Sequence, residues 1–300
     1  MTPLPTTIPQ YLDQLRVALA GADPALVQDA LYDAEEYLRS ELAEQPGRTE
    51  AEVIASVASS YGAPEEVADI YRDTEVRVQT ALAPPKPKPR RSLPGRFFGV
   101  VADPHTYGAM FYMLLSLATG IFYFSWVVTG VSLSLGLSIL VIGVPLLILF
   151  VGSTRVLSLV EGRIVETMLG ERMPRRPLYA NQGKSWGTRI VELFTDPRTW
   201  ATMLYFILML PLGIAYFTVV VTGITTSLAL IATPIAAMFG MDGTLMLDGI
   251  DVWSVVEPWQ WVLAIVAGVL LFFVTLHVCR LIGRGHAQLA KHLLVRTSAY

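Results

Sequence analysis

The sequence predicts an all-α protein, with a small four-helix bundle followed by a helical membrane domain of two repeated hairpins. Composition is the first reason: of 300 residues, 53% are hydrophobic and only 16% are charged, and the mean hydropathy is +0.51. Ordinary water-soluble domains carry more charge than this. The second reason is helical apolar periodicity before residue 83, and the third is a repeat within the apolar part.

Composition and motifs also exclude several function classes. The one cysteine, Cys279, cannot form an intramolecular disulfide, and no Cys and His cluster has the spacing of a metal site. The sequence therefore implies neither a metal nor another cofactor. Phosphate-binding loops and serine-hydrolase, metalloprotease and kinase motifs are missing, which argues against an enzyme. Because the N-terminus lacks the regions of a secretory signal, we expect the first segment to stay in the cytosol.

The first two helices of the bundle follow from apolar spacing and one cap. Asp23 followed by Pro24 is a typical helix start, and the second helix should run to about Gln45. The first helix places Tyr11, Leu12, Leu15 and Leu19 on one face. The second buries Val27, Leu31, Ala34, Leu38 and Leu42, while Asp29, Asp33, Glu36 and Arg39 fall elsewhere.

The third and fourth helices have equally clear starts. Thr49 and Glu52 have the spacing of a capping box, and Gly62 should end the third helix. Pro64 opens the fourth, with Glu65 and Glu66 at the positive end of its dipole. The expected buried residues are Val53, Ile54, Val57 and Tyr61 in the third helix, and Val67, Ile70 and Tyr71 in the fourth.

The bundle, assigned to residues 1–82, is strongly acidic. Up to Thr80 it has 15 Asp and Glu against 5 Lys and Arg. This charge disfavours direct binding of nucleic acid, whose phosphates need basic contacts. The surface is either a solvated acidic face or a docking surface for a basic partner.

Residues 83–95 form a linker rich in proline and basic residues. Prolines favour an extended conformation, which makes the linker a stiff spacer. Its basic side chains should contact anionic lipid headgroups, each contributing roughly 1 kcal/mol. They are Lys86, Lys88, Arg90 and Arg91.

Residues 96–300 are assigned to the membrane domain, whose first hairpin needs two spans. No Lys or Arg occurs between Arg96 and Arg155. We place the spans at about Tyr107–Val128 and Leu135–Val156, joined by an outward turn at Thr129–Ser132. The second helix should continue along the membrane interface to Leu169.

The second half of the membrane domain repeats the first. Asp103-Pro-His-Thr-Tyr returns as Asp196-Pro-Arg-Thr-Trp, and Gly120-Ile-Phe-Tyr-Phe returns as Gly213-Ile-Ala-Tyr-Phe. The Val-Val-Thr-Gly blocks ending at Gly130 and Gly223 keep the same offset of 93 residues. The segments 103–170 and 196–295 should therefore share a fold and pack as pseudo-symmetric hairpins. Gly120, Gly130, Gly213 and Gly223 allow either close helix packing or a turn, and we prefer the packing interpretation.

The region after Gly223 allows two topologies. The apolar stretch Thr225–Phe239 is either re-entrant or packed at the outer surface, which leaves four spans, or it is a fifth span. Basic residues gather at 155–198 and 280–296, whereas 242–257 contains four carboxylates and no basic residue. The positive-inside rule therefore favours four spans, with both termini in the cytosol and the last span at about Trp259–Ile282.

The membrane part, residues 93–295, resembles the bacterial "Putative sensor" domain, which often precedes histidine-kinase catalytic domains. The paired Asp-Pro-x-Thr-aromatic starts, the two repeated blocks and the run Val141–Leu147 carry this resemblance. The resemblance implies a sensor. Because the sequence continues only briefly after its last span, we expect no kinase domain and no autophosphorylation.

The N-terminal bundle is similar to the HAAS-type helical signalling domain of membrane proteins associated with PadR-type regulators. The runs Tyr11–Leu15, Asp33–Tyr37 and Ser59–Ala68 carry this similarity, with Tyr61 where the family usually has Leu. It implies a bacterial membrane protein that signals to a cytosolic regulator such as one of the PadR type. The candidate partner-binding residues are Glu35, Glu36, Gly62, Pro64, Glu65 and Glu66.

Candidate sensing residues lie near both ends of the last span. His277 is an ionisable residue among apolar ones, so it is either a sensor or a group that bonds a neighbouring carbonyl. The outer acidic segment either binds a cation or a cationic peptide, or is a solvated loop. The candidates are Asp242, Asp248, Asp251, Trp253, Glu257 and His277, with Trp253 also suited to anchor the interface.

Three function classes remain: a signalling protein, a small transporter or accessory permease subunit, and a membrane-embedded enzyme. A transporter needs polar residues around a midplane cavity, and the spans contain almost none. An enzyme needs a nucleophile, a base and a stabilising group that converge. A non-enzymatic membrane sensor in the bacterial cytoplasmic membrane is thus the preferred interpretation, and the sequence leaves a homo-oligomer open.

Overall fold

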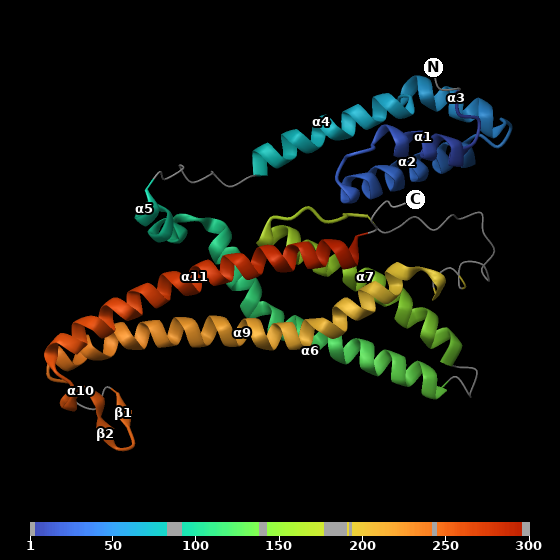
Figure 1. Cartoon of the computed structure of the whole chain (residues 1–300). Helices are drawn as coiled ribbons and strands as arrows, with labels where there is room; N and C mark the ends of the chain where they lie inside the picture. Colours follow the sequence, from blue (N-terminus) through green and yellow to red (C-terminus); the bar gives the residue numbers. More distant parts are fainter. Residues whose placement is uncertain are drawn as a thin grey trace. The chain divides into compact units, whose positions relative to one another are not determined.

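The computed structural model of the protein describes residues 4–82, 92–137, 143–176, 191, 194–241 and 245–295 (Figure 1). The fold divides into two compact units. The first comprises Met1–Pro85, Gly130–Tyr205 and Leu289–Tyr300, and the second comprises Lys86–Thr129 and Phe206–Gln288. Each unit thus combines segments that are distant in sequence. The linker residues Lys86, Lys88, Arg90 and Arg91, with their predicted lipid contacts, lie outside the described residues.

The N-terminal bundle consists of α1 (Ile8–Ala18), α2 (Pro24–Glu44), α3 (Glu50–Ser60) and α4 (Pro64–Leu82). The three predicted helix starts, at Asp23, Thr49 and Pro64, are confirmed. The Asp23 side chain accepts a hydrogen bond from the amide of Ala25, and Thr49 and Glu52 form the reciprocal capping box. These bonds satisfy amides that have no partner inside the helix, so the sequence fixes where each helix begins.

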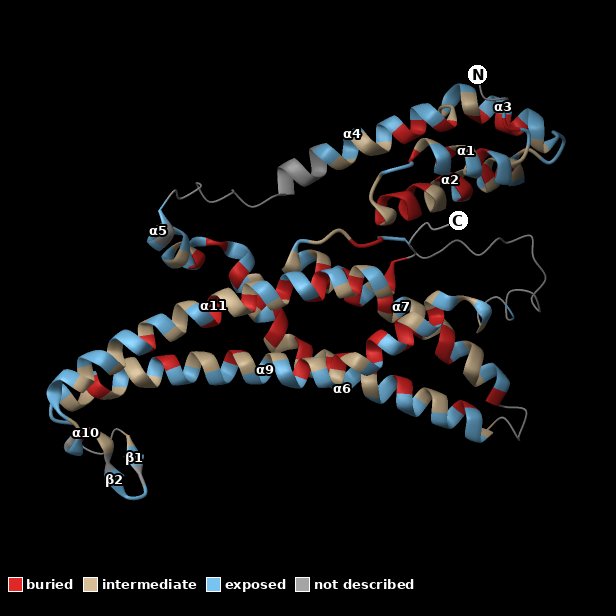
Figure 2. Ribbon diagram, in the orientation of Figure 1, coloured by how far each residue is buried: buried red, intermediate tan, exposed pale blue. Residues whose placement is uncertain are grey.

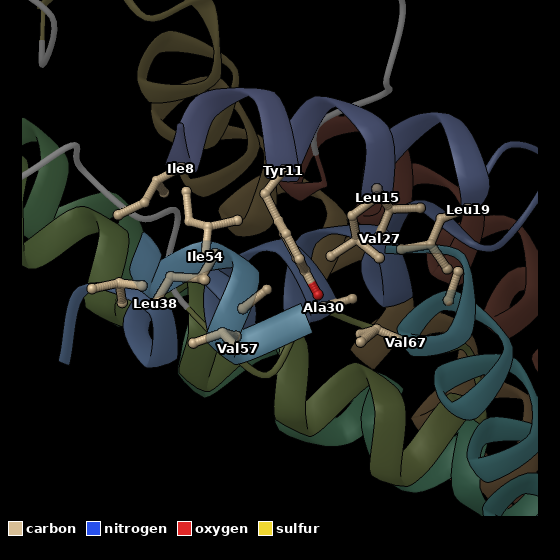
Figure 3. Close-up of a cluster of buried hydrophobic side chains, with 13 residues drawn as sticks. Ile8, Tyr11, Leu15, Leu19, Val27, Ala30, Leu38, Ile54, Val57 and Val67 are labelled. Carbon is tan, nitrogen blue, oxygen red and sulfur yellow. The ribbon is translucent and has the colours of Figure 1, made fainter. Parts of the chain in front are cut away.

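The four apolar faces of the bundle bury one another around Tyr11 (Figure 3). The Tyr11 side chain is fully buried, and its hydroxyl donates to the carbonyl of Gly62 at 2.8 Å. One predicted core residue was wrong, because Ile70 is 57% exposed. Val67 and Ala68 are buried and Tyr71 packs against them. At about 100° per residue, Ile70 lies outside the arc that these three define.

Four helices of the described residues are long and apolar enough to span a membrane: α6 (Pro104–Leu137), α7 (Gly143–Leu169), α9 (Pro197–Met238) and α11 (Pro258–Leu294). Only 22 to 33% of the most apolar window of each is buried within the protein. Buried and exposed residues alternate around these helices in Figure 2. Such exposed apolar surface suits contact with lipid, so this is a multi-pass membrane protein.

The predicted turn at Thr129–Ser132 was wrong, because these residues lie inside α6. The second helix of the hairpin, α7, is continuous to Leu169 as expected but begins at Gly143 rather than near Leu135. Gly130 explains the difference. A Cβ at this position would overlap the ring of Phe150 on α7, so the glycine provides close packing between two helices and does not form a turn.

The segment Thr225–Phe239 is neither re-entrant nor a fifth span, since all of it but Phe239 belongs to α9. Pro211 and Pro234 lie inside this helix without ending it. A helix of 42 residues is about 63 Å long, roughly twice the thickness of a bilayer's hydrocarbon core. One helix can therefore contain the third span and also extend beyond the lipid.

Short elements complete the described chain. α5 (Leu93–Phe98) and the 3₁₀ turn η1 (Gly99–Ala102) precede α6. The strands β1 (Met246–Leu247) and β2 (Ile250–Asp251) form an antiparallel ladder in which Met246 lies opposite Asp251. The short helix α10 (Val252–Val255) then precedes α11. This small hairpin lies in the segment before the last span, which the sequence predicts to face outward.

Equivalent residues of the two hairpins make equivalent contacts. The first helices, α6 and α9, correspond at the predicted offset of 93 residues, and the second helices, α7 and α11, correspond at 125. Arg280 pairs with Asp103 at 2.8 Å, and Arg155 pairs with Asp196 at 3.2 Å. Similarly, Gly130 contacts Phe150 and Gly223 contacts Thr275. The repeat therefore extends to both helices of each hairpin.

The two helices α6 and α9 meet through a reciprocal contact within the second unit. A Cβ on Gly120 would overlap the carbonyl oxygen of Met209, and a Cβ on Gly213 would overlap that of Ser116. Shifting one contact by 93 residues gives the other with the helices exchanged. Both glycines are needed because helix backbones approach this closely only where no side chain separates them.

Candidate functional site

The structure places the predicted partner-binding residues in different environments. Glu35 is buried, and Arg39 binds its carboxylate at 2.9 Å within the same helix. Burial is also the main cause that raises the pKa of Glu35. Pro64 is buried and Gly62 is half-buried, whereas Glu36, Glu65 and Glu66 are exposed. Glu66 accepts the amide of Ala63 at 3.2 Å and so stabilises the start of α4.

The main charged site of the bundle is centred on Asp29, which sequence reasoning placed outside the core. Asp29 is only 5% exposed. Its Oδ1 accepts the backbone amides of Arg175 at 2.7 Å and Arg176 at 2.9 Å, and its Oδ2 accepts Nη2 of Arg172 at 3.0 Å. The carboxylate thus binds one short segment, residues 171–176, that follows α7.

Arg172 is the cationic centre of this site. Its side chain is 9% exposed and binds Glu75 of α4 as well as Asp29 of α2. A guanidinium can serve two carboxylates because it presents several donors in one plane. Charges this deeply buried are tolerated only when paired, so Arg172 and its two carboxylates depend on one another.

Residues on both sides of Asp29 along α2 make further contacts with the basic segments. The Gln28 amide donates to the carbonyl of Arg176 at 2.7 Å and accepts from Arg198, at the start of α9, at 2.9 Å. The guanidinium of Arg176 lies 3.0 Å from Asp33 and 5.6 Å from the centre of the Tyr32 ring. Arg176 is half exposed, so this pair should contribute less than that of Arg172.

A third membrane helix also contacts the bundle. Lys291, near the end of α11, binds Asp23 at 2.7 Å and also binds Glu171. Basic residues after α7, at the start of α9 and near the end of α11 therefore all contact α2 or its cap. The acidic bundle and the basic helix ends of this unit complement each other in charge.

Burial shifts the pKa of Asp29, the carboxylate at the centre of this site. Burial raises the pKa of the Asp29 carboxyl, and the amides of Arg175 and Arg176 and the charge of Arg172 oppose this only in part. When a folded-state pKa is raised, the stability from that group is complete below the unfolded value and is lost as pH rises through the folded value. As far as Asp29 is concerned, the folded state should thus lose stability as the pH rises through this raised pKa.

The predicted sensing residues are dispersed. The ring of His277 lies 3.0 Å from the carbonyl of Phe97, which is the neighbouring-carbonyl bond considered for it. Asp248 and Glu257 are exposed, Trp253 is buried, and Asp251 belongs to β2. Asp242 lies outside the described residues. Within the part of the chain that the structure describes, no group of three His, Cys, Asp or Glu side chains could hold a metal ion.

Two buried ionisable residues of the long helices α7 and α11 were missed by sequence reasoning. Glu161 accepts the hydroxyl of Tyr205 at 2.9 Å, and His286 lies 2.5 Å from the hydroxyl of Tyr112. Tyr112 and Tyr205 correspond at the offset of 93, and Glu161 and His286 at 125. The signal that could have revealed them is the repeat, had it been extended to the second helix of each hairpin.

Two family models match the chain. One described as "Putative sensor" matches residues 112–294, and one described as "HAAS" matches residues 10–70. No curated protein and no solved structure matches it. The two family matches agree with the two resemblances seen in the sequence, in the same order along the chain.

Proposed function

Since the chain belongs to the "Putative sensor" family, we propose that it is a sensor whose bundle passes a membrane or envelope signal to a cytosolic regulator. Its sensor and HAAS regions are those of a signalling-related membrane protein, and neither family is enzymatic. We accordingly propose a non-enzymatic role, in which the membrane helices change the state of the bundle.

One observation carries this proposal: the bundle is bound to the ends of three membrane helices through charged residues. Arg172 follows α7, Arg198 begins α9, and Lys291 lies near the end of α11. A rearrangement of these helix ends would break contacts at Asp29, Gln28 or Asp23. A signal in the membrane therefore has a direct physical route to the bundle, provided that the two states differ in partner affinity.

The proposed partner is a cytosolic regulator of the PadR type, with which HAAS domains are generally linked. Its contact surface would include the exposed carboxylates Glu36 and Glu65. Their negative charge suits a basic protein surface and not direct contact with nucleic acid. The regulator, and not this chain, would then bind DNA.

Charge reversal should separate partner binding from folding. A PadR-type regulator is co-expressed with the protein, and the regulator that copurifies with the solubilised protein is measured. The double variant Glu36→Lys/Glu65→Lys should lower the recovered regulator by about tenfold, which corresponds to a loss of about 1.4 kcal/mol of binding free energy, within the usual allosteric range. Asp13→Lys/Glu44→Lys, with the same change of net charge at exposed positions, is the control. Unchanged recovery for the first pair and for a chain lacking residues 1–82 would favour a transporter or scaffold role.

We also propose that the protein lies in the bacterial cytoplasmic membrane with both termini in the cytosol. In a Cys279→Ser background, Ile250→Cys, exposed on β2, should react with an impermeant maleimide added to intact cells. Glu44→Cys in the bundle should react only after lysis. The charge asymmetry of the sequence motivates this orientation. Labelling of Glu44→Cys in intact cells would disprove it.

A further inference from the structure

We propose that the Asp29 site is a binding site for an extended, arginine-bearing peptide, occupied here by the chain's own residues 171–176. In the signalling state, the same site would accept an arginine-bearing segment of the regulator. This inference rests on the proposed function, because it specifies the chemistry of the partner and the means of regulation.

The recognition of residues 171–176 has the features of a peptide site. Two successive amides, of Arg175 and Arg176, share Oδ1 of Asp29, while Gln28 binds the carbonyl of Arg176. These hydrogen bonds are made to backbone groups, so the site would bind a segment with any residue except proline at the two positions that donate their amides. Specificity comes from Arg172, whose guanidinium reaches the buried carboxylate of Asp29 and the half-buried carboxylate of Glu75.

The acidic surface continues beyond the segment that now covers it. Asp29, Asp33 and Glu36 follow one another on α2 at intervals of four and three residues, which places them on one face. The segment covers Asp29 and reaches Asp33, whereas Glu36 is exposed. A basic partner could therefore bind first at the open end of this face and then replace the segment at Asp29.

Tethering explains how the chain can block its own site. Residues 171–176 belong to the same chain as the bundle, so their binding is intramolecular and a separate segment must compete with a permanently linked one. Met173 packs with its Cβ 3.3 Å from the position that a Cβ on Gly162 would occupy, which links the segment to α7 itself. A movement of α7 would withdraw the segment and expose Asp29.

A labelled peptide corresponding to residues 170–176 tests the inference on the full-length protein in detergent. Arg172→Ala/Arg175→Pro should empty the site, because it removes the guanidinium and one of the two amides. Fluorescence anisotropy should then detect saturable binding to this variant, at least tenfold tighter than to the wild type, whose own segment competes. Adding Asp29→Asn should weaken binding at least tenfold, because the amide NH₂ would face the guanidinium.

Three controls make the result decisive. Asp69→Asn, at an exposed carboxylate of α4, should leave binding to the emptied variant unchanged. A peptide with citrulline for Arg172, or with an N-methyl group on the amide of Arg176, should bind weakly. Absence of saturable binding to an emptied variant with unchanged circular dichroism would overturn the inference, as would binding that is indifferent to Asp29→Asn. Either result leaves the proposed function standing if the Glu36 and Glu65 reversal still lowers recovery of the regulator.

Discussion

Arg172→Met is expected to detach residues 171–176 from the bundle and to cost about 3 to 5 kcal/mol, the usual loss when one partner of a buried ion pair is removed. The methionine can fill part of the space but leaves Asp29 and Glu75 without their shared cation. Hydrogen exchange of the Arg175 and Arg176 amides, which bind Asp29 in the wild type, should then accelerate by about two to four orders of magnitude.

The pH dependence of this variant provides a further check. Removing Arg172 removes a charge that lowers the pKa of Asp29, so the already raised value should rise further. Protonation of Asp29 then removes its unpaired negative charge, so the docking of residues 171–176 onto the bundle should recover as the pH falls. Arg16→Met removes an exposed ion pair with Asp13. It should change neither the hydrogen-exchange rate of the Arg175 and Arg176 amides nor the pH dependence of that rate. Equal exchange rates in wild type and Arg172→Met would show that the site does not hold the segment.

Gly120→Ala is expected to force α6 and α9 apart, with a loss of about 3 kcal/mol, at the upper end for overpacking. The added Cβ would overlap the carbonyl oxygen of Met209, and a backbone atom inside a helix cannot move aside as a flexible side chain can. Gly213→Ala should have a similar effect through Ser116. The double variant should lose less than the sum, because one substitution already separates the helices.

Gly136→Ala is the matched control, since it lies on α6 and its added Cβ would have no atom of the described residues within 4 Å apart from its own helical turn. It should leave stability unchanged or raise it by up to about 1 kcal/mol, because alanine favours helix over glycine. Thermal unfolding in one detergent compares the variants. A Gly120→Ala protein as stable as Gly136→Ala would mean that the two helices do not meet at this contact.

The sequence located the local features of the fold because their causes are local. The caps at Asp23 and Thr49 depend on residues two or three positions away, and the apolar stripes depend on helical periodicity. The turn predicted at Thr129–Ser132 failed for the same reason. A glycine that ends a helix and a glycine that admits the ring of Phe150 have the same local sequence, and only the distant partner distinguishes them.

The candidate site shows the same division. The sequence alone determined that the bundle is acidic, that the ends of the spans are basic, and that the hairpins repeat. Only the tertiary structure decided that Asp29, of the fifteen carboxylates of the bundle, is buried against Arg172, some 143 residues later in the chain. The physical reason is that net charge follows from composition, whereas desolvation and pairing depend on which distant groups the fold brings within hydrogen-bonding distance.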